Sequence, residues 1–235
     1  MTGPQVSDDS AAKRGFYIRF GKRIFDLVVA TFALVVLSPL LLILSLASLL
    51  FLGSPVIFAQ VRAGFQGRPF TLYKFRSMLN LRDASGMLLP DEQRLSAFGK
   101  LLRHTSMDEL PGFWNVIRGD LSLIGPRPLP VEYTQFYSAK QAERLNIKPG
   151  MAGYAALFGR NAQPWEAIFE RDVWYSRSVS FALDLKIIFG VVRLVPSRKG
   201  IDRGDHDVAS PFADTLKKNL STPNPGGEGM REGAP

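Results

Sequence analysis

Two adjacent carboxylates, Asp108 and Glu109, have the types and spacing that could do chemistry. An ionised Asp can act as a nucleophile toward phosphorus, and neighbouring carboxylates can hold a hard divalent cation through their oxygens. With Ser106 as N-cap and Glu109 at the third helical position, the stretch also has the form of a capping box. In one interpretation these acids only cap a helix. In the other, the field at the helix N-terminus keeps Asp108 ionised and favours phosphate binding beside it.

Several basic residues would suit a diphosphate bound near these acids. Arg127 lies between Pro126 and Pro128 and follows Gly125, in a locally stiff loop that presents the guanidinium at little entropic cost. Taken singly, a basic residue is more often an ordinary surface residue than a ligand. The candidates for phosphate binding are Lys74, Arg76, Arg103, Arg118 and Arg127.

The composition restricts what kind of site these residues can form. The chain has 235 residues, no Cys and two His, which excludes disulfides, thiolate metal sites and Cys nucleophiles and argues against a His-based metal site. Its net charge of +8 indicates an anionic partner: a nucleic acid, a phosphorylated ligand or an acidic lipid. No nucleic-acid-binding motif is present. We therefore expect no nucleic-acid partner.

A long uncharged segment precedes the candidate site. Residues 27–52 carry no charge, and this run of 26 residues exceeds the about 20 that a membrane-spanning helix needs. A cleavable signal peptide fits less well because its apolar stretch is typically about 7–15 residues, and a buried core helix of this length without charge would be unusual. Ser38 and Pro39 lie near its middle, so we expect a kink there, with Ser38 as a possible cap of the second half.

The charges on the two sides of this segment bear on its topology. Lys and Arg residues precede it, and more of them follow in residues 53–76, where there is no acidic residue. The positive-inside tendency would place both ends in the cytoplasm. A single span cannot satisfy that arrangement, whereas a re-entrant helix-break-helix can. We therefore expect a re-entrant membrane helix over residues 16–58.

The rest of the chain predicts a mainly α fold with a small β-hairpin, an α+β protein. Residues 56–60 and 70–75 are β-prone, and the Gly and Pro residues between them predict a hairpin with a long loop. Residues 95–103 read as a short helix. A second helix should begin near Ser106, because the apolar residues that follow recur at helical spacing. These residues are Leu110, Phe113, Trp114 and Ile117.

The C-terminal part predicts one more helix and a tail. Residues 178–195 are apolar but interrupted by charges, which suits either a helix in the membrane interface or an ordinary core helix. Residues 201–235, with much Gly and Pro and little aliphatic periodicity, predict a disordered tail. The polar residues 1–15 predict a disordered N-terminus. Residues 59–200 are then the catalytic domain, on the cytosolic face and with interfacial helices.

Several multi-residue blocks resemble the bacterial sugar transferase family, the small monotopic phosphoglycosyl transferases that act on polyprenyl phosphate. The resemblance covers about residues 18–200, with the blocks in order. The blocks are QVRAG (60–64), YKFRSM (73–78), SMDELP (106–111), WNVIRGDLSLIGPRP (114–128) and KPGMAG (148–153).

The resemblance implies a two-step transfer. Such enzymes move a sugar 1-phosphate from a UDP-sugar to polyprenyl (undecaprenyl) phosphate, release UMP and depend on Mg²⁺. Asp108 would attack the β-phosphorus and form a phosphosugar-aspartyl intermediate, and it would also be a metal ligand. Glu109 would position the metal or manage the acceptor proton. The phosphate- and substrate-binding residues would be Lys74, Arg76, Arg103, Gly125, Pro126, Arg127 and Gly150.

The resemblance also implies a location and leaves a question. It implies a monotopic protein of the bacterial inner membrane, broken at Ser38-Pro39, that contacts membrane lipids and has both termini and the active site on the cytoplasmic face. Residues 151–152 (Met-Ala) depart from the common Ile-Thr pair, and residues 154–156 (Tyr-Ala-Ala) depart from Trp-Ala-Gln. Because of these two departures, the resemblance does not identify the sugar that is transferred. A membrane-anchored binding module without catalysis is the alternative of a different class.

Overall fold

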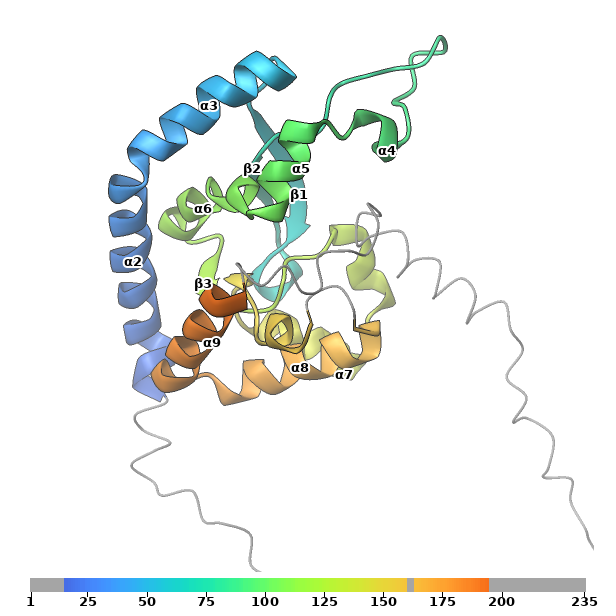
Figure 1. Cartoon of the computed structure of the whole chain (residues 1–235). Coiled ribbons are helices and arrows are strands. Elements are labelled where there is room, and N and C mark those ends of the chain that lie inside the picture. Colours follow the sequence, from blue (N-terminus) through green and yellow to red (C-terminus); the bar gives the residue numbers. More distant parts are fainter. Residues whose placement is uncertain (1–14, 160–162, 195–235) are drawn as a thin grey trace, which may run out of the picture.

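The computed structural model describes residues 15–159 and 163–194, and these form a mostly helical body with two small sheets (Figure 1). This agrees with the predicted α+β class, except that only one of the two sheets was expected. The predicted disordered tail and nearly all of the predicted disordered N-terminus lie outside the described residues, so those two predictions stay untested.

The apolar segment forms two helices that meet at a sharp bend. The π-helix η1 (Tyr17–Gly21) runs directly into α2 (Lys22–Val36), and α3 (Ser38–Leu52) follows after Leu37. The two halves are bent by 63°, and they run along the outside of the body in Figure 1. Pro39 occupies the first turn of α3, where its missing N–H has no helical partner to lose. The predicted break at Ser38-Pro39 is therefore present.

Ser38 acts differently from the expected cap. Its hydroxyl donates a 2.8 Å hydrogen bond back to the carbonyl of Val35, and no side chain caps α3. The prediction that Ser38 caps the second half-helix is wrong, because the hydroxyl bonds to a carbonyl of α2 on the other side of the bend.

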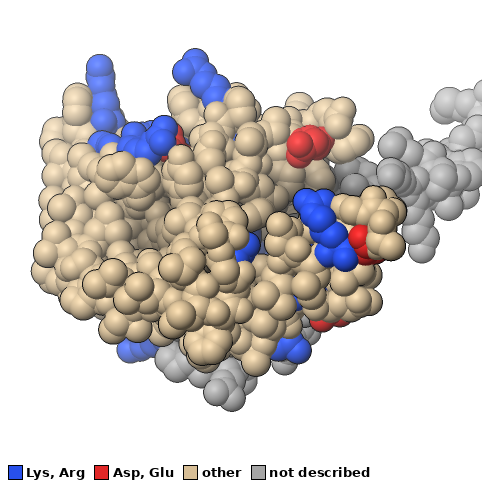
Figure 2. All heavy atoms as spheres, turned by 90° about the horizontal axis from the view of Figure 1, so that it is seen from above, with Lys and Arg blue, Asp and Glu red and all other residues tan. Residues whose placement is uncertain are grey.

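The outer surfaces of α2 and α3 are apolar and exposed. Among the described residues no single helix has the length and apolar character to cross a membrane, while the bent pair η1–α2 and α3 does by length and composition. Figure 2, viewed from the α3 side, shows a wide uncharged surface with Lys and Arg mainly around it. The large apolar side chains that are more than half exposed on α2 and α3 are Ile24, Val28, Phe32, Val35, Val36, Leu42, Ile43, Leu46, Leu50 and Phe51.

The two sheets lie on the inner side of this bent pair. Strands β1 (Ile57–Ala63) and β2 (Pro69–Phe75) form the predicted antiparallel hairpin, in a register that pairs Ile57 with Phe75. Strands β3 (Ser122–Ile124) and β4 (Gly150–Ala152) form a short parallel pair that was not predicted.

Short helices connect these strands and carry the candidate site. Helix α5 (Ala97–His104) agrees with the predicted helix at 95–103, and Ser96 caps it by accepting from the Gly99 N–H at 3.1 Å. The 3₁₀ turn η3 (Met107–Glu109) and helix α6 (Gly112–Arg118) stand where one continuous helix was expected. The remaining short elements are η2 (Phe65–Gly67), α4 (Asp91–Arg94), η4 (Val131–Phe136), α7 (Ala139–Ala142), η5 (Glu143–Asn146) and η6 (Tyr154–Phe158).

Two C-terminal helices close the core against the N-terminal ones. Helix α8 (Trp165–Ser178) was not predicted, and α9 (Phe181–Leu194) was. Ile187 of α9 is fully buried in the main core, whereas Phe189 and Val192 are exposed. Helix α9 therefore contributes to the core on one face and presents apolar side chains on another, so its position in a membrane interface stays a prediction.

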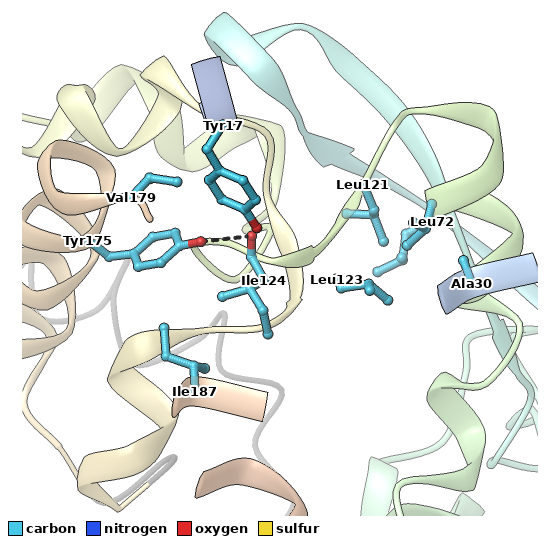
Figure 3. Packing of buried hydrophobic residues seen from close by; sticks show 10 residues of the cluster. Tyr17, Ala30, Leu72, Leu121, Leu123, Ile124, Tyr175, Val179 and Ile187 are labelled. Atoms are coloured by element: carbon cyan, nitrogen blue, oxygen red, sulfur yellow. Dashed lines mark hydrogen bonds between the residues drawn. The ribbon is translucent and has the colours of Figure 1, made fainter. Parts of the chain in front are cut away.

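A buried polar cluster joins the two ends of the described chain. The fully buried Asp184 of α9 accepts hydrogen bonds from the hydroxyls of Tyr17 (2.7 Å) and Tyr175 (2.5 Å). It also accepts from the ammonium of Lys22 at 2.6 Å. In Figure 3 the two tyrosines converge beside Ile124, whose carbonyl accepts from Tyr175 at 3.2 Å. The cluster fixes α9 against the start of the bent pair.

Candidate active site

The dyad (Asp108 and Glu109) lies in the single 3₁₀ turn η3 that follows α5. Ser106 precedes it with φ of +56°, in the left-handed region, and its side chain makes no cap hydrogen bond. An N-cap residue needs an extended backbone, so a left-handed Ser cannot serve as one. The predicted capping box is therefore wrong, and the interpretation in which the two acids only cap a helix loses its basis.

The dyad faces basic side chains from two other segments. Lys74 of β2 places its Nζ 2.8 Å from Oε1 of Glu109, and an Nη of Arg127 lies 3.4 Å from the same oxygen. The side chain of Arg127 is 54% exposed, so it reaches over the site from the surface. One pocket is lined by Glu109, Lys74 and Arg127 together with Arg62, Leu72, Tyr73, Gly112, Leu121, Pro128, Gly150 and Met151.

The environment of Asp108 raises its pKa to about 6. Burial is the main cause, and the negative charge of Glu109 adds to it. The positive charges of Lys74, Arg127 and Arg103 act in the opposite direction. The expectation that a helix field holds Asp108 ionised needs correction, because burial outweighs the favourable charges. At neutral pH the carboxylate form still predominates, since the pKa lies about one unit below.

Arg103 approaches the dyad from α5 and has a fixed orientation. Its Nε donates to the hydroxyl of Ser77 at 2.9 Å, and its charge lowers the pKa of Asp108. Of the predicted phosphate-binding residues, the structure thus gathers Lys74, Arg103 and Arg127 around the dyad.

Arg76 occupies a different place. It is 8% exposed, and its guanidinium donates to the carbonyls of Leu52, Gly53 and Ser54 at the end of α3, the last of these at 3.0 Å. The cation therefore satisfies the carbonyls that a helix C-terminus leaves without partners. The geometry gives no support to Arg76 as a phosphate ligand.

Arg118, at the end of α6, also lies outside the pocket lining. Its Nε is 3.3 Å from Asp120, and its side chain is half exposed. Such an exposed ion pair contributes little to stability or to binding. The structure thus leaves Arg118 outside the group of basic residues that surrounds the dyad.

Gly125, Pro126 and Gly150 belong to the backbone that supports Arg127. The Gly125 N–H donates to the carbonyl of Ala152 at 2.9 Å, and the Gly150 N–H donates to the carbonyl of Pro126 at 3.0 Å. A Cβ at Gly150 would lie 2.0 Å from the backbone nitrogen of Gly125, so this close approach requires glycine. Gly150 lines the pocket, whereas Gly125 and Pro126 fix the loop behind it.

Sequence reasoning missed several residues that build the pocket. Arg62 lines it and donates to Oε1 of Gln60 at 2.5 Å, although its block QVRAG was noticed only for the resemblance. The fully buried Asn115 likewise belongs to a block, residues 114–128, and was noticed only for the resemblance, without a structural role. Its amide donates to the carbonyl of Thr71 at 2.7 Å and accepts from the Tyr73 N–H at 3.0 Å. Asn115 thereby holds β2 against α6, which places Lys74 beside the dyad.

The donor set of the dyad fits Mg²⁺ in its chemistry. Among residues 15–159 and 163–194 no three His, Cys, Asp or Glu side chains come together. Mg²⁺ does not require three, because it keeps several waters and is commonly held by one or two carboxylates together with substrate phosphates. The repulsion that raises the pKa of Asp108 is also what a cation between the two carboxylates would relieve.

Comparisons with known proteins point to one family. Residues 17–198 match the family described as bacterial sugar transferase. The chain is 51% identical over 191 residues to "Uncharacterized sugar transferase EpsL" of Bacillus subtilis (strain 168), which covers 81% of this chain and 95% of that protein.

Two further relatives have named activities and are longer than this chain. The "UDP-glucose:undecaprenyl-phosphate glucose-1-phosphate transferase" of Klebsiella pneumoniae is 39% identical over 178 residues, 72% of this chain and 38% of that protein. The protein of the same name in Escherichia coli (strain K12) is 36% identical over 181 residues, 73% of this chain and 39% of that protein. The chain spans about two fifths of the length of these two relatives.

Proposed function

The chain belongs to the bacterial sugar transferase family, and on that premise we propose that it transfers a sugar 1-phosphate from a UDP-sugar to undecaprenyl phosphate with release of UMP. The observation that carries the proposal is the half-buried Asp108 next to Glu109, which lines one pocket with Lys74 and Arg127, two cations whose charges also act on Asp108. A carboxylate nucleophile among fixed cations suits attack on a diphosphate, because the cations balance charge on the phosphates. The names of the relatives support this substrate pair.

In the first step Asp108 acts as the nucleophile. A carboxylate oxygen forms a bond to the phosphorus that bears the sugar, and the bond from that phosphorus to the bridging oxygen of the diphosphate breaks. The electron pair of this bond leaves with UMP. Lys74, Arg103 and Arg127, which surround the dyad, would hold the phosphate oxygens and stabilise the charge that moves during the step.

In the second step undecaprenyl phosphate resolves the acyl phosphate. An oxygen of its phosphate forms the new bond to the sugar-bearing phosphorus, and the bond to the Asp108 oxygen breaks. The carboxylate of Asp108 returns, and the product is a lipid diphosphate sugar. Glu109, next to Asp108, would either take any proton carried by the incoming phosphate or bind a cation, and the two roles are alternatives.

A magnesium ion fits the dyad, with Asp108 as its expected ligand and Glu109 beside it. When bound it would neutralise negative charge on the diphosphate and favour departure of UMP. This expectation rests on the two adjacent carboxylates and on the repulsion between them.

The membrane placement forms part of the proposal. We infer that the bent pair η1–α2 and α3 enters the lipid and returns to the same side, since its exposed faces are apolar and cations precede and follow it. The active site and both ends would then lie on the cytoplasmic face of the bacterial inner membrane. This arrangement brings a site for a soluble nucleotide sugar close to a lipid-borne acceptor.

The experiment is an assay of UMP release by the purified chain in nanodiscs that contain undecaprenyl phosphate. The donors are UDP-glucose, UDP-galactose and UDP-N-acetylgalactosamine. Under multiple-turnover conditions we expect UMP release with at least one of these donors, and only when both Mg²⁺ and the acceptor are present. Tight binding of a donor without UMP release would contradict the proposal and favour a membrane-anchored binding module. Cysteines at positions 10 and 60 should react only with a reagent on the cytoplasmic side.

A further inference from the structure

The loop that carries Arg127 is fixed by hydrogen bonds from three separate segments. The parallel strands hold its start, through the bonds of Gly125 and Pro126 described above, and the Ala63 N–H donates to the carbonyl of Leu129 at 2.9 Å. Between these points the peptide from Arg127 to Pro128 has no N–H, because its nitrogen belongs to proline. The carbonyl of Arg127 is therefore the only polar group through which that peptide can be fixed.

A buried arginine from a distant element fixes that carbonyl. Arg144 of η5 donates through Nη2 to the carbonyl oxygen of Arg127 at 2.8 Å. The same guanidinium donates to Asp172 of α8 through Nε at 3.1 Å and through Nη2 at 2.6 Å. Both side chains of this pair are 2% exposed. The contact joins a fully enclosed ion pair to the backbone of a residue whose own side chain reaches the pocket.

The guanidinium of Arg144 has little freedom to move. The ring of Tyr137 lies 5.8 Å from its central carbon and the ring of Phe169 lies 5.3 Å from it. The hydroxyl of Tyr137 also accepts from Nη1 at 3.3 Å. Aromatic rings beside a planar cation, together with a carboxylate on its edge, define both its plane and its rotation.

The stability of the fold does not by itself explain a buried ion pair such as Arg144 and Asp172. A buried ion pair loses much of its Coulombic attraction to the cost of removing both charges from water, and apolar residues of similar volume often stabilise a fold as well or better. What a buried arginine with several acceptors supplies is geometry, since the rigid, planar set of N–H donors fixes the positions of those acceptors. Here one of those acceptors is the backbone of Arg127.

We propose that Arg144 and Asp172 are positioning residues for Arg127, and that they set the reach of its guanidinium toward a bound diphosphate. The inference rests on the proposed function and deepens it, because it assigns to a buried pair outside the pocket a part in binding the donor. Neither residue lines the pocket, so neither is expected to touch substrate.

The test is a double-mutant cycle between R144K and R127A. R144K keeps the positive charge opposite Asp172. A lysine ammonium cannot bond to the Asp172 carboxylate and the Arg127 carbonyl in the fixed geometry of a guanidinium, so the loop that carries Arg127 should shift. A misplacement of about 1 Å at a reacting group can cost about 100-fold, and we expect R144K to raise the KM for the UDP-sugar by about 10-fold or more with a smaller change in kcat. In the R127A background the same change should have less than about a twofold effect, because its target is already absent.

The chain offers a closely matched control. Arg177 of α8 donates to Glu143 of η5 at 2.7 and 2.6 Å. This pair joins the same two elements as Arg144 and Asp172, and Glu143 directly precedes Arg144 in the sequence. This pair is exposed, and both hydrogen bonds run between Arg177 and Glu143. R177K should therefore leave KM and kcat unchanged within about twofold.

A second readout does not depend on turnover. The dissociation constant of UDP, the part shared by all the candidate donors, is measured by calorimetry on the wild type, R127A, R144K and the double variant. D172N, which keeps the guanidinium but removes its counter-charge, should weaken UDP binding in the same direction as R144K.

The outcomes separate the two claims. If the wild type binds UDP but transfers no sugar, the proposed function fails, while the cycle on UDP binding still tests the positioning role. If R144K weakens binding by the same factor with and without Arg127, the pair acts by another route and the inference is overturned. It is also overturned if R144K binds as the wild type does, or if neither R144K nor D172N folds.

Discussion

Nζ of Lys74 lies 2.8 Å from Oε1 of Glu109, and this contact joins the β1–β2 hairpin to the 3₁₀ turn that carries Asp108. The cation also lowers the pKa of Asp108, against the effects of burial and of Glu109. The relationship depends on Asn115, which fixes β2 beside α6. Lys74 therefore both lowers the pKa of Asp108 and balances the negative charge of Glu109 in the pocket.

We expect K74M to reduce kcat/KM for the UDP-sugar by about 100-fold, in the range found when one fixed donor to a developing charge is removed. The loss combines a missing phosphate contact with a higher pKa of Asp108. Steady-state assays of UMP release measure it. K100M, at an exposed position on α5, serves as the control and should behave as the wild type.

The pH dependence of the free enzyme should show the raised pKa of Asp108. Because only the carboxylate is nucleophilic, kcat/KM should fall as the pH drops below about 6. E109Q removes a charge that raises this pKa, so the acidic limb of its residual activity should move to lower pH. K74M removes a charge that lowers it, so the limb should move to higher pH. Limbs that coincide in all three proteins would mean that another group controls the profile.

Arg76 tests the corrected assignment of a predicted phosphate ligand. R76M leaves the carbonyls at the end of α3 without their buried donor, so we expect a loss in the free energy of unfolding of about 1–3 kcal/mol. The KM of the folded variant for the UDP-sugar should stay within about twofold of the wild type. A large increase in KM without loss of stability would return Arg76 to the list of substrate ligands. R82M, on an exposed loop, controls for loss of charge.

Asp184 tests how the C-terminal helix is attached to the bent pair. D184N leaves the ammonium of Lys22 without its buried counter-charge and alters two tyrosine hydrogen bonds, so a loss of about 3–5 kcal/mol is expected. Thermal unfolding in nanodiscs measures it. The effects of Y17F and D184N should be clearly less than additive, because both act on the same hydrogen bond. Additive losses would show that the cluster does not work as a unit.

Local patterns in the sequence predicted the elements that depend on local physics. The uncharged run with Pro39 near its middle predicted two helices and a break, and the Gly and Pro residues between β-prone runs predicted the hairpin. The parallel pairing of β3 with β4 could not be predicted in this way, because each strand has three residues and its partner lies far along the chain. Helix α8 was missed although Trp165, Ile168, Phe169 and Val173 recur at helical spacing, because charged residues are interspersed among them.

The candidate site was predicted in part for the same reason. The sequence predicted several site residues from their types alone, and the structure brings five of them together. These are the dyad, Lys74, Arg103 and Arg127. Arg76 carries the same charge in the same block as Lys74, and only its position beside the end of α3 separates their roles. Ser106 has a left-handed backbone, so it cannot serve as the N-cap that the residues around it predicted.

The most direct test of the central claim is the intact mass of the protein after mixing with the UDP-sugar and Mg²⁺ in the absence of acceptor. The wild type should gain the mass of one sugar phosphate and release one equivalent of UMP, and addition of undecaprenyl phosphate should restore the original mass. D108N, folded and still bound to the membrane, should gain no mass. A wild type that turns over without ever carrying the added mass, or a D108N variant that turns over at a substantial rate, would contradict Asp108 as the nucleophile.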